Sequence, residues 1–262
     1  MEPLFRSGGK AADYRDPELS PEGVSTTTTE PLSADQRQAH ERLVEEWNHQ
    51  LEGATAEEII DWASTHVTGP IAVTMSMQDT ILAELTDGKL DNAELVFLDT
   101  GYHFPETIET RDKVEQRYEL PLRNITPVLT REEQDEVYGP RLYSTNPTAC
   151  CRMRKVEPLA RMLDPFEAWI TGIRRVDSAL RANTPVLEVD RTGRLKINPL
   201  VEWSDEQVES YIADHDLIIH PLTTQGYPSI GCATCTLPVA EGQDPRSGRW
   251  AGSSKTECGL HT

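Results

Sequence analysis

The sequence is short of positive charge and of long apolar stretches. It has 25 lysines and arginines against 44 aspartates and glutamates, which gives a formal net charge of −19 at pH 7. Because nucleic-acid backbones are bound mainly by basic surfaces, this charge argues against a nucleic-acid partner. No stretch approaches the ~20 apolar residues of a membrane span, so no membrane association is expected. No long apolar run follows residues 1–6, so a secretory signal is not expected either.

Cysteine is also scarce, but its pattern is informative. Five cysteines in a chain of this size favour metal or redox chemistry over a disulfide framework, and hence a reducing cytoplasm. Cys150 and Cys151 are adjacent, Cys232 and Cys235 form a C-x-x-C pair, and Cys258 remains as a free thiol. Four thiolates suit zinc or an iron–sulfur cluster. The missing spacer in the first pair favours a multi-iron cluster, where each thiolate takes its own iron.

The 262 residues can bury one α/β core. Residues 1 to about 32 have no apolar period and are expected to be disordered. Residues 33–235 carry alternating strand and helix patterns, which predict one domain with a mainly parallel sheet and helices on both faces. Residues 236–262 are rich in glycine, proline and serine, which predicts a mobile C-terminal tail.

Local signals place the elements of the domain. Capping boxes predict helices that begin after Ser33, Thr55, Thr130 and Ser204. Further helices are expected at 81–85, at 105–118 from Pro105 and at 148–159, the last with Asn146 or Thr148 as N-cap. Apolar runs predict strands at 71–74, 95–98, 125–129 and 168–171, and a hairpin made by 186–189 and 195–197.

Polar residues follow two of these strands. Ser76, Asp79 and Thr80 come after the first strand, where α/β proteins bind phosphates at the carboxyl edge of the sheet. The loop lacks glycines, so it favours an adenylate with one phosphate over a pyrophosphate. Arg174 and Arg175 follow the strand at 168–171, and paired arginines suit bidentate recognition of phosphate or sulfate.

Taken together, the cysteine pattern and the terminal Glu-Cys-Gly-Leu-His at 257–261 resemble the assimilatory adenylyl-sulfate (APS) reductases of iron–sulfur type. These enzymes belong to the sulfonucleotide (APS/PAPS) reductase family. The segment Leu-Asp-Thr-Gly-Tyr-His-Phe-Pro-Glu-Thr at 98–107 resembles the family's LDTGxxFPET, and 171–175 resembles its TGxRR. The resemblance runs from about Pro70 to the C-terminus and implies an adenine nucleotide alpha hydrolase-like fold.

The resemblance implies a reaction in sulfate assimilation and cysteine biosynthesis. Cys258 attacks the sulfur of APS, AMP leaves, and thioredoxin or a similar dithiol releases sulfite from the S-sulfocysteine. One 4Fe-4S cluster is expected on Cys150, Cys151, Cys232 and Cys235. Lys155, on the same helix face as Cys151, is expected to link cluster and substrate. The expected activators and sulfate binders are Arg246, Arg249 and His261. The family is often oligomeric, and one sequence sets no number of subunits.

Three alternatives remain open from the sequence. A reductase for 3′-phosphorylated PAPS is one, although family members with that preference generally lack the four cluster cysteines. A nucleotide-activating ligase or tRNA thiolase of the same fold is another, but it needs a pyrophosphatase loop that residues 76–80 do not offer. The third is a zinc-stabilised, non-enzymatic nucleotide-binding protein, which predicts zinc without sulfide. His103 is interpreted either as a nucleotide contact or as a loop histidine.

Overall fold

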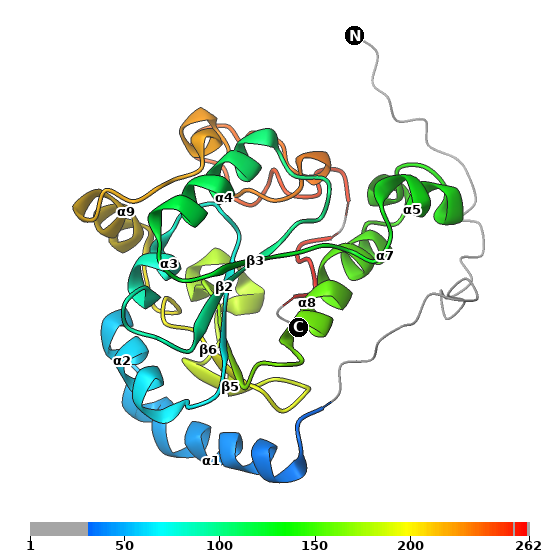
Figure 1. Cartoon of the computed structure of the whole chain (residues 1–262). Coiled ribbons are helices and arrows are strands. Elements are labelled where there is room, and N and C mark those ends of the chain that lie inside the picture. Colours follow the sequence, from blue (N-terminus) through cyan, green and yellow to red (C-terminus); the bar gives the residue numbers. More distant parts are fainter. Residues whose placement is uncertain (1–30, 254, 261–262) are drawn as a thin grey trace.

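A computed structural model describes residues 31–253 and 255–260 of the chain (Figure 1). Most of the segment predicted to be disordered, residues 1–32, lies outside the described residues. Within its end, Leu32 donates its backbone N–H to Thr192 O at 3.0 Å. Among the described helices, none combines the length and the apolar character that crossing a membrane requires.

The described strands form one six-stranded sheet with the order β3-β2-β1-β4-β6-β5. All neighbouring pairs are parallel except β5 with β6 at one edge. The chain leaves β1 toward β2 and β3 on one side and returns to β4 on the other, so the strand order reverses between β1 and β4. Open sheets of this type bind ligands at such a reversal. The strands are β1 Ile71–Met75, β2 Ala93–Leu98, β3 Leu122–Ile125, β4 Ala168–Ile170, β5 Leu187–Val189 and β6 Leu195–Ile197.

Side chains of the central strands alternate between two apolar cores, as the two-residue period of a strand requires. Val73 and Ile170 face the larger core, and Ala72, Val96 and Trp169 face the smaller one. Figure 1 shows helices on both sides of the sheet, which confirms the predicted α/β class. The larger core is covered by α1 Ala34–Leu51, α2 Ala56–His66, α3 Ile81–Thr86, α4 Pro105–Arg117 and α9 Asp205–Asp214, and the smaller by α8 Glu157–Leu163.

The predicted capping boxes are present at the start of α1, α2, α5 (Arg131–Tyr138) and α9. In each, the hydroxyl of Ser33, Thr55, Thr130 or Ser204 accepts the backbone N–H three residues on, at 3.1–3.3 Å. These bonds satisfy donors that the first helical turn leaves without partners. Helix starts were therefore predicted correctly wherever the signal was local.

The third predicted strand was wrong in position. It was expected at 125–129, but β3 spans Leu122–Ile125 and its ladder to β2 ends with the pair Leu98 and Ile125. Pro127 lies inside the expected run and has no N–H to give to a ladder. Val128 is 54% exposed, so the apolar residues beyond β3 do not form a buried strand.

The helix predicted at 148–159 is interrupted. It consists of α7 Pro147–Cys151, a π-helical turn at Arg152–Val156, and α8. Asn146, one of the two predicted caps, accepts the N–H of Ala149 at 3.0 Å. The wide turn begins directly after the cysteine pair, and π-helical turns occur frequently at functional sites.

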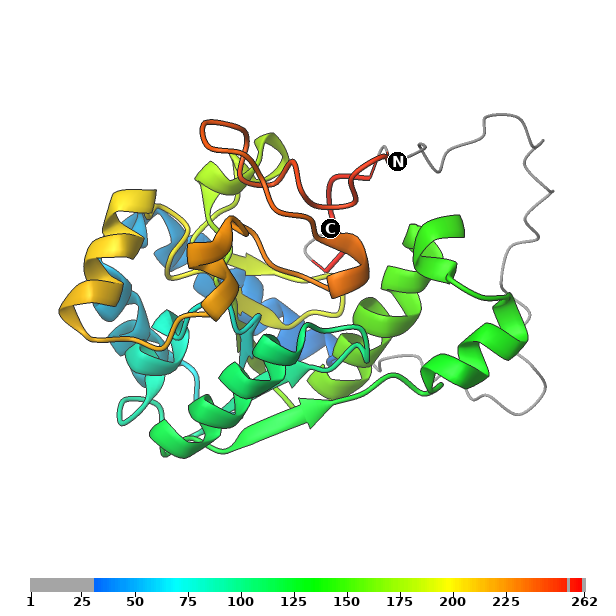
Figure 2. The same cartoon turned by 90° about the horizontal axis from the view of Figure 1, so that it is seen from above.

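The C-terminal segment folds back on the domain in the part of it that the structure describes (Figure 2). Leu237 N–H donates to Gly248 O, Val239 N–H to Gly226 O, and Trp250 N–H to Cys235 O, at 2.8–2.9 Å. Trp250 is buried, with 5% of its surface exposed. The structure thus gives one packed position of the tail, and the mobility of residues 236–262 stays a prediction.

His103 occupies a structural position in the loop after β2. Its Nε2–H donates to Leu98 O at 2.8 Å, and its ring lies 4.9 Å from the Phe97 ring. Burial disfavours the imidazolium and lowers the pKa of His103 to about 4. These contacts hold the histidine in its loop, but its Nδ1 is buried without a hydrogen-bond partner, and a nucleotide contact through it stays a prediction.

The pH dependence of stability follows from this pKa. An unfolded chain takes up a proton at His103 below about pH 6.5, whereas the native protein does so only near pH 4. The free energy of unfolding should therefore fall by about 1–2 kcal/mol between pH 7 and pH 5 through this residue. Urea unfolding of the wild type and of His103→Gln at both pH values measures it. The substitution should remove that part of the slope, and His49→Gln, at an exposed site, should keep it.

Candidate active site

Three loops meet at the carboxyl edge of the sheet, after β1, β2 and β4. The C-terminal segment lies across them, as Figure 2 shows. His220 N–H donates to Gln78 O in the loop after β1, and Ala233 N–H donates to Tyr102 O in the loop after β2. Ser178, in the segment after β4, donates its hydroxyl to Glu257. Because parallel strands end at the same edge, these distant segments of sequence are brought to one place.

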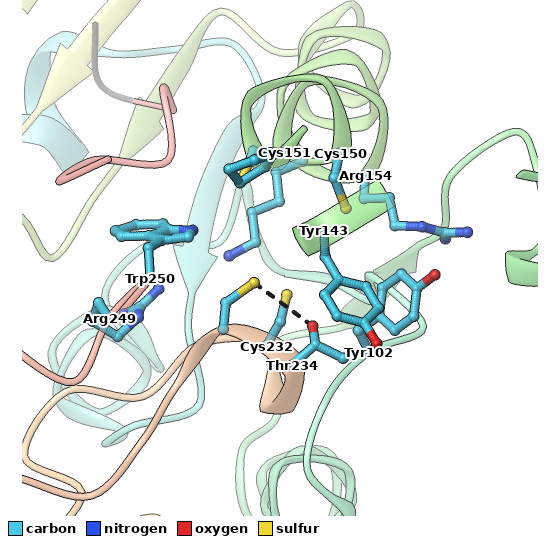
Figure 3. A pocket seen from close by; sticks show the side chains of 12 residues that line it. Tyr102, Tyr143, Cys150, Cys151, Arg154, Cys232, Thr234, Arg249 and Trp250 are labelled. Atoms are coloured by element: carbon cyan, nitrogen blue, oxygen red, sulfur yellow. Dashed lines mark hydrogen bonds between the residues drawn. The ribbon is translucent and has the colours of Figure 1, made fainter. Parts of the chain in front are cut away.

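The four predicted ligand cysteines line one pocket (Figure 3). Cys150 and Cys151 come from α7, and Cys232 and Cys235 flank a 3₁₀ turn at Ala233–Cys235 on the opposite side. All five cysteines of the chain are free thiols. In the described residues, no three His, Cys, Asp or Glu side chains are arranged to hold a single metal ion. The four thiols therefore surround a space without converging on one point.

The loop after β2 joins the two cysteine pairs. Thr100 Oγ1 lies 3.3 Å from Cys232 Sγ, and Tyr102 packs in one apolar cluster with Cys150. Arg154, buried below the pair, donates Nη1–H to Thr100 O at 3.0 Å and stacks 4.9 Å from the Tyr102 ring. The pocket is thus held by backbone and aromatic contacts that do not depend on its contents.

Burial raises the pKa of the Cys150, Cys151 and Cys235 thiols, so these three resist deprotonation when no cation is bound. Burial and the neighbouring thiols of Cys151, Cys232 and Cys235 raise the pKa of Cys150 to about 12, and Arg154 opposes this rise. Burial likewise raises the pKa of Cys235. Four thiolates can exist together here only against a strong positive charge. The donor set and its electrostatics fit a metal cluster.

Cys258 lies among cations beside this pocket and is half-buried. Burial alone would lower the pKa of Lys155, but the nearby thiols of Cys232 and Cys258 raise it above its ordinary value. Burial lowers the pKa of Arg249, and Cys258 acts against that change. The tail therefore brings its thiol within electrostatic reach of Lys155 and Arg249, which also line the cysteine pocket.

Arg249 is fixed by close packing. Its Nη1–H groups donate to Ser229 Oγ and Ile230 O at 3.2 Å, and its guanidinium stacks 4.7 Å from the Trp250 ring. A Cβ at Gly231 would lie 2.2 Å from Arg249 Nη2. Glycine at 231 is thus what allows the guanidinium to reach the pocket.

A row of alternating charges links the tail to the segment after β4. Arg174 pairs with Asp205 at 2.8 Å and with Asp177 at 2.9 Å, and Asp177 pairs with Arg181 at 2.9 Å. Arg181 pairs with Glu257 at 2.8 Å, and Glu257 pairs in turn with Arg246 at 3.2 Å. This row, from Asp205 to Arg246, is called the charge row below. It places two guanidinium groups, those of Arg181 and Arg246, in contact with Glu257, the residue that precedes Cys258.

Residues 70–238, more than half of the chain, match the family model described as the phosphoadenosine phosphosulfate reductase domain. The chain belongs to this reductase family. The match begins at the residue before β1 and ends just after the second cysteine pair. It confirms the family that the sequence motifs predicted, the sulfonucleotide reductases.

Relatives within the family are similar over nearly their whole length. A protein named adenosine 5′-phosphosulfate reductase from Streptomyces coelicolor is 48% identical over 235 residues, covering 89% of this chain and 96% of that protein. One of the same name from Mycolicibacterium smegmatis is 48% identical, covering 84% of this chain and 93% of its own. Phosphoadenylyl-sulfate reductase from Candida auris, solved in a phosphate complex, superimposes with a TM-score of 0.64 at 28% identity, over 79% of this chain and 98% of its own.

A further solved structure is similar to this chain in fold alone. Candida glabrata FMN adenylyltransferase superimposes with a TM-score of 0.52 at 14% identity, over 85% of this chain and 83% of its own. Both superpositions agree with the mainly parallel sheet described above. The predicted adenine nucleotide alpha hydrolase-like class is thereby confirmed for this member of the reductase family.

The structure does not gather all the predicted substrate-binding residues. Ser76 is exposed and Asp79 half-buried near Arg174, where burial raises the pKa of Asp79. Thr80 is fully buried, and its hydroxyl donates to Ile218 O while it accepts from Tyr118. A substrate contact by Thr80 would need this packing to open.

Arg175 also points away from the cysteine pocket. Its guanidinium pairs with Glu52 and Glu202 at 2.8–2.9 Å, and its Nε–H donates to Thr184 O. These contacts tie the TGxRR-like segment to the end of α1. His261, predicted as a sulfate binder, lies outside the described residues.

Sequence reasoning gave no role to Glu257 and treated Arg181 only as one of several basic residues. Both side chains are 12% exposed in their ion pair. The pair joins positions 76 residues apart, so no local pattern predicts it. In the sequence, the position of Glu257 next to the cysteine in the terminal motif was the signal that could have indicated a role for it.

Gly231→Ala tests the placement of Arg249. The added methyl group would force the guanidinium away, and because that group ends a flexible side chain, the fold should lose little stability. Removing a charged contact of this kind should lower reductase turnover roughly tenfold or more. Steady-state kinetics and thermal unfolding measure the two effects.

Gly248→Ala is the matched comparison. Its added methyl group would meet the backbone oxygen of Leu237 at 2.2 Å, so the main chain of the tail must move. Amide exchange in the tail should accelerate in Gly248→Ala and stay slow in Gly231→Ala. Normal turnover in Gly231→Ala would show that Arg249 does not serve the reaction.

Proposed function

We propose that this protein reduces adenosine 5′-phosphosulfate to sulfite and AMP, with thiols as the source of electrons. The observation that carries the proposal is the position of Cys258 at the carboxyl edge of the sheet, between Glu257, which bonds to Ser178 and Arg181, and Leu260, which packs on the smaller core. Relatives that are 48% identical over nearly their whole length carry the name of this activity. The cytoplasm, where thiols stay reduced, is the compartment that fits five free cysteines.

The substrate would enter where the strand order reverses. Its adenosine would lie near the loops after β1 and β4, the general place of nucleotide binding in open α/β sheets. Its phosphate and sulfate carry negative charge, and Arg174, Arg246, Arg249 and Lys155 supply positive charge around that crevice. An acidic protein thereby concentrates cations at one locality, which attracts an anionic substrate.

The first step is a displacement at sulfur. The Cys258 thiolate forms a bond to the sulfur of APS, the bond from that sulfur to the phosphate oxygen breaks, and AMP leaves with the electron pair. An S-sulfocysteine remains. Lys155 and Arg249 stabilise the thiolate before attack and the charge on the departing phosphate afterwards.

The second step needs a dithiol carrier such as thioredoxin. One carrier thiolate attacks the sulfur of Cys258, the bond between the two sulfurs of the adduct breaks, and sulfite leaves. The second carrier thiol then releases Cys258 and closes a disulfide in the carrier. Two electrons pass from the dithiol to the sulfonyl sulfur, so no other reductant is required.

The residues that would hold a 4Fe-4S cluster are Cys150, Cys151, Cys232 and Cys235. Four thiols surround one space without forming a site for a single ion in the described chain, and burial raises the pKa of Cys150 to about 12. When bound, the cluster supplies structural cross-linking and a local charge that Lys155 balances.

An adduct measurement tests function, nucleophile and substrate together. After anaerobic incubation with APS and no carrier, intact-mass spectrometry should show a sulfite-mass adduct on Cys258. Cys258→Ser should form none, because serine cannot make the sulfur–sulfur bond. Incubation with PAPS tests the second candidate function, that of a PAPS reductase. An equal adduct from PAPS would contradict the assignment to APS, and no adduct from either would overturn the mechanism.

Metal analysis tests the cluster. Protein purified without oxygen should hold about four irons and four inorganic sulfides per chain. Cys232→Ser should lose both, whereas Cys258→Ser should keep both because the tail thiol is not a ligand. Zinc without sulfide would support the non-enzymatic binding protein instead. Loss of iron in Cys258→Ser would mean that the ligand set is wrong.

A further inference from the structure

Glu257, the residue before Cys258, is held by three side chains from two separate parts of the chain. Its Oε1 accepts hydrogen bonds from Ser178 Oγ at 3.1 Å and Arg181 Nε at 3.0 Å. Its Oε2 accepts from Arg181 Nη2 at 2.8 Å and Arg246 Nη2 at 3.2 Å. Both carboxylate oxygens are therefore bonded twice, and Arg181 binds in the two-pronged manner that guanidinium and carboxylate geometry favours.

The electrostatics of this contact favour the ionised carboxylate. Burial alone would raise the pKa of Glu257, but Arg181, Arg246 and the Ser178 hydroxyl hold it below its ordinary value. Charge-assisted hydrogen bonds in a partly buried place are stronger than neutral ones and are less screened by salt. Ordinary surface ion pairs do not share these properties.

The receiving side of the contact is held by ion pairs among residues outside the tail. Arg181 is oriented by Asp177, and Asp177 is shared with Arg174, which is fixed in turn by Asp205. These four residues belong to the segment after β4 and to the start of α9. Their order along the charge row gives the tail a fixed point on the folded domain.

The other side of Cys258 is fixed by apolar packing. Leu260 packs against the smaller core beside Leu98 and Ile125, at the carboxyl ends of β2 and β3. Gly259, which lies between Cys258 and Leu260, has a φ of 85°, a backbone conformation that suits glycine and turns the chain. Cys258 is thus held between a polar contact before it and an apolar contact after it.

We propose that Glu257 is a positioning residue whose carboxylate, bonded within the tail to Arg246, fastens the tail to Arg181 of the domain and so holds Cys258 in place for attack on the substrate sulfur. The inference rests on the proposed function. Attack needs the tail closed, whereas the carrier needs it open to reach the adduct. An ion pair suits both demands, because it aligns the thiol and yet separates without breaking a covalent bond.

If Glu257 has this role, its loss should slow only one of the two steps of the reaction, the formation of the adduct. Glu257→Gln keeps the shape of the side chain but removes the charge, so the closed position should be occupied less. Adduct formation at saturating APS should slow about tenfold or more, as the loss of a charge-assisted contact implies. Sulfite release from a preformed adduct should not slow, because that step uses the open tail.

The experiment uses the cluster-containing full chain. Single-turnover mass spectrometry with APS gives the rate of adduct formation, and addition of dithiothreitol to the isolated adduct gives the rate of sulfite release. Glu241→Gln is the matched control, because Glu241 is exposed in the same segment. It should equal the wild type in both rates. Ser178→Ala should slow adduct formation less than Glu257→Gln and add little to it in the double variant.

Alkylation of Cys258 by iodoacetamide without substrate provides a readout independent of activity. The half-buried thiol should react faster in Glu257→Gln and unchanged in Glu241→Gln. Unchanged alkylation and adduct formation in Glu257→Gln would overturn the proposal. Equal slowing of both half-reactions, with a lower melting temperature, would also overturn it and indicate a general structural role. If the wild type forms no adduct, the proposed function fails, and the alkylation rates still decide whether Glu257 holds the tail.

Discussion

The charge row from Asp205 to Arg246 governs how the candidate site is assembled. In a chain of net charge −19, each arginine at the carboxyl edge can find a carboxylate. Three guanidinium groups and three carboxylates alternate along the row, and Asp177 serves both Arg174 and Arg181. This sharing holds the guanidinium groups in fixed orientations. Buried charges that are fixed in this way can interact with an incoming anion with little rearrangement of their surroundings.

The cysteine pocket and the tail are joined by direct contacts. Trp250 N–H donates to Cys235 O, and the Trp250 ring lies below Arg249 and Lys255. The tail therefore begins its path at the second cysteine pair, which faces the first pair across the pocket. Anything that joins the two pairs also sets the starting point of the tail. A cluster bridging them would act on the position of Cys258 through the backbone, without taking part in the displacement at sulfur.

Local signals in the sequence predicted the fold well, and non-local contacts limited the rest. The capping boxes at Ser33 and Thr130 need only three neighbouring residues, so the helix starts were correct. The end of β3 at Ile125 had a local signal in Pro127, whereas no sequence signal was used to expect the π-helical turn after Cys151. For the site, residue types singled out as a set the four cysteines that line one pocket. Arg175 pairs with Glu52, 123 residues away, and Glu257 pairs with Arg181, 76 residues away, so these contacts required the structure.

The loop after β1 shows why this fold serves a substrate with a single phosphate here. Met77 has a φ of 64°, a conformation usually left to glycine, and its side chain is fully buried in the larger core. Burying a methionine side chain contributes about 1.5–3 kcal/mol, more than the roughly 1–2 kcal/mol that the left-handed backbone costs. The side chain of the next residue is also held by hydrogen bonds, because Gln78 donates to Pro228 O and accepts from the N–H of Ile230. A loop filled and tied in this way leaves little room to wrap a pyrophosphate, so under the proposed function binding of the anion would fall to arginines from the other loops and the tail.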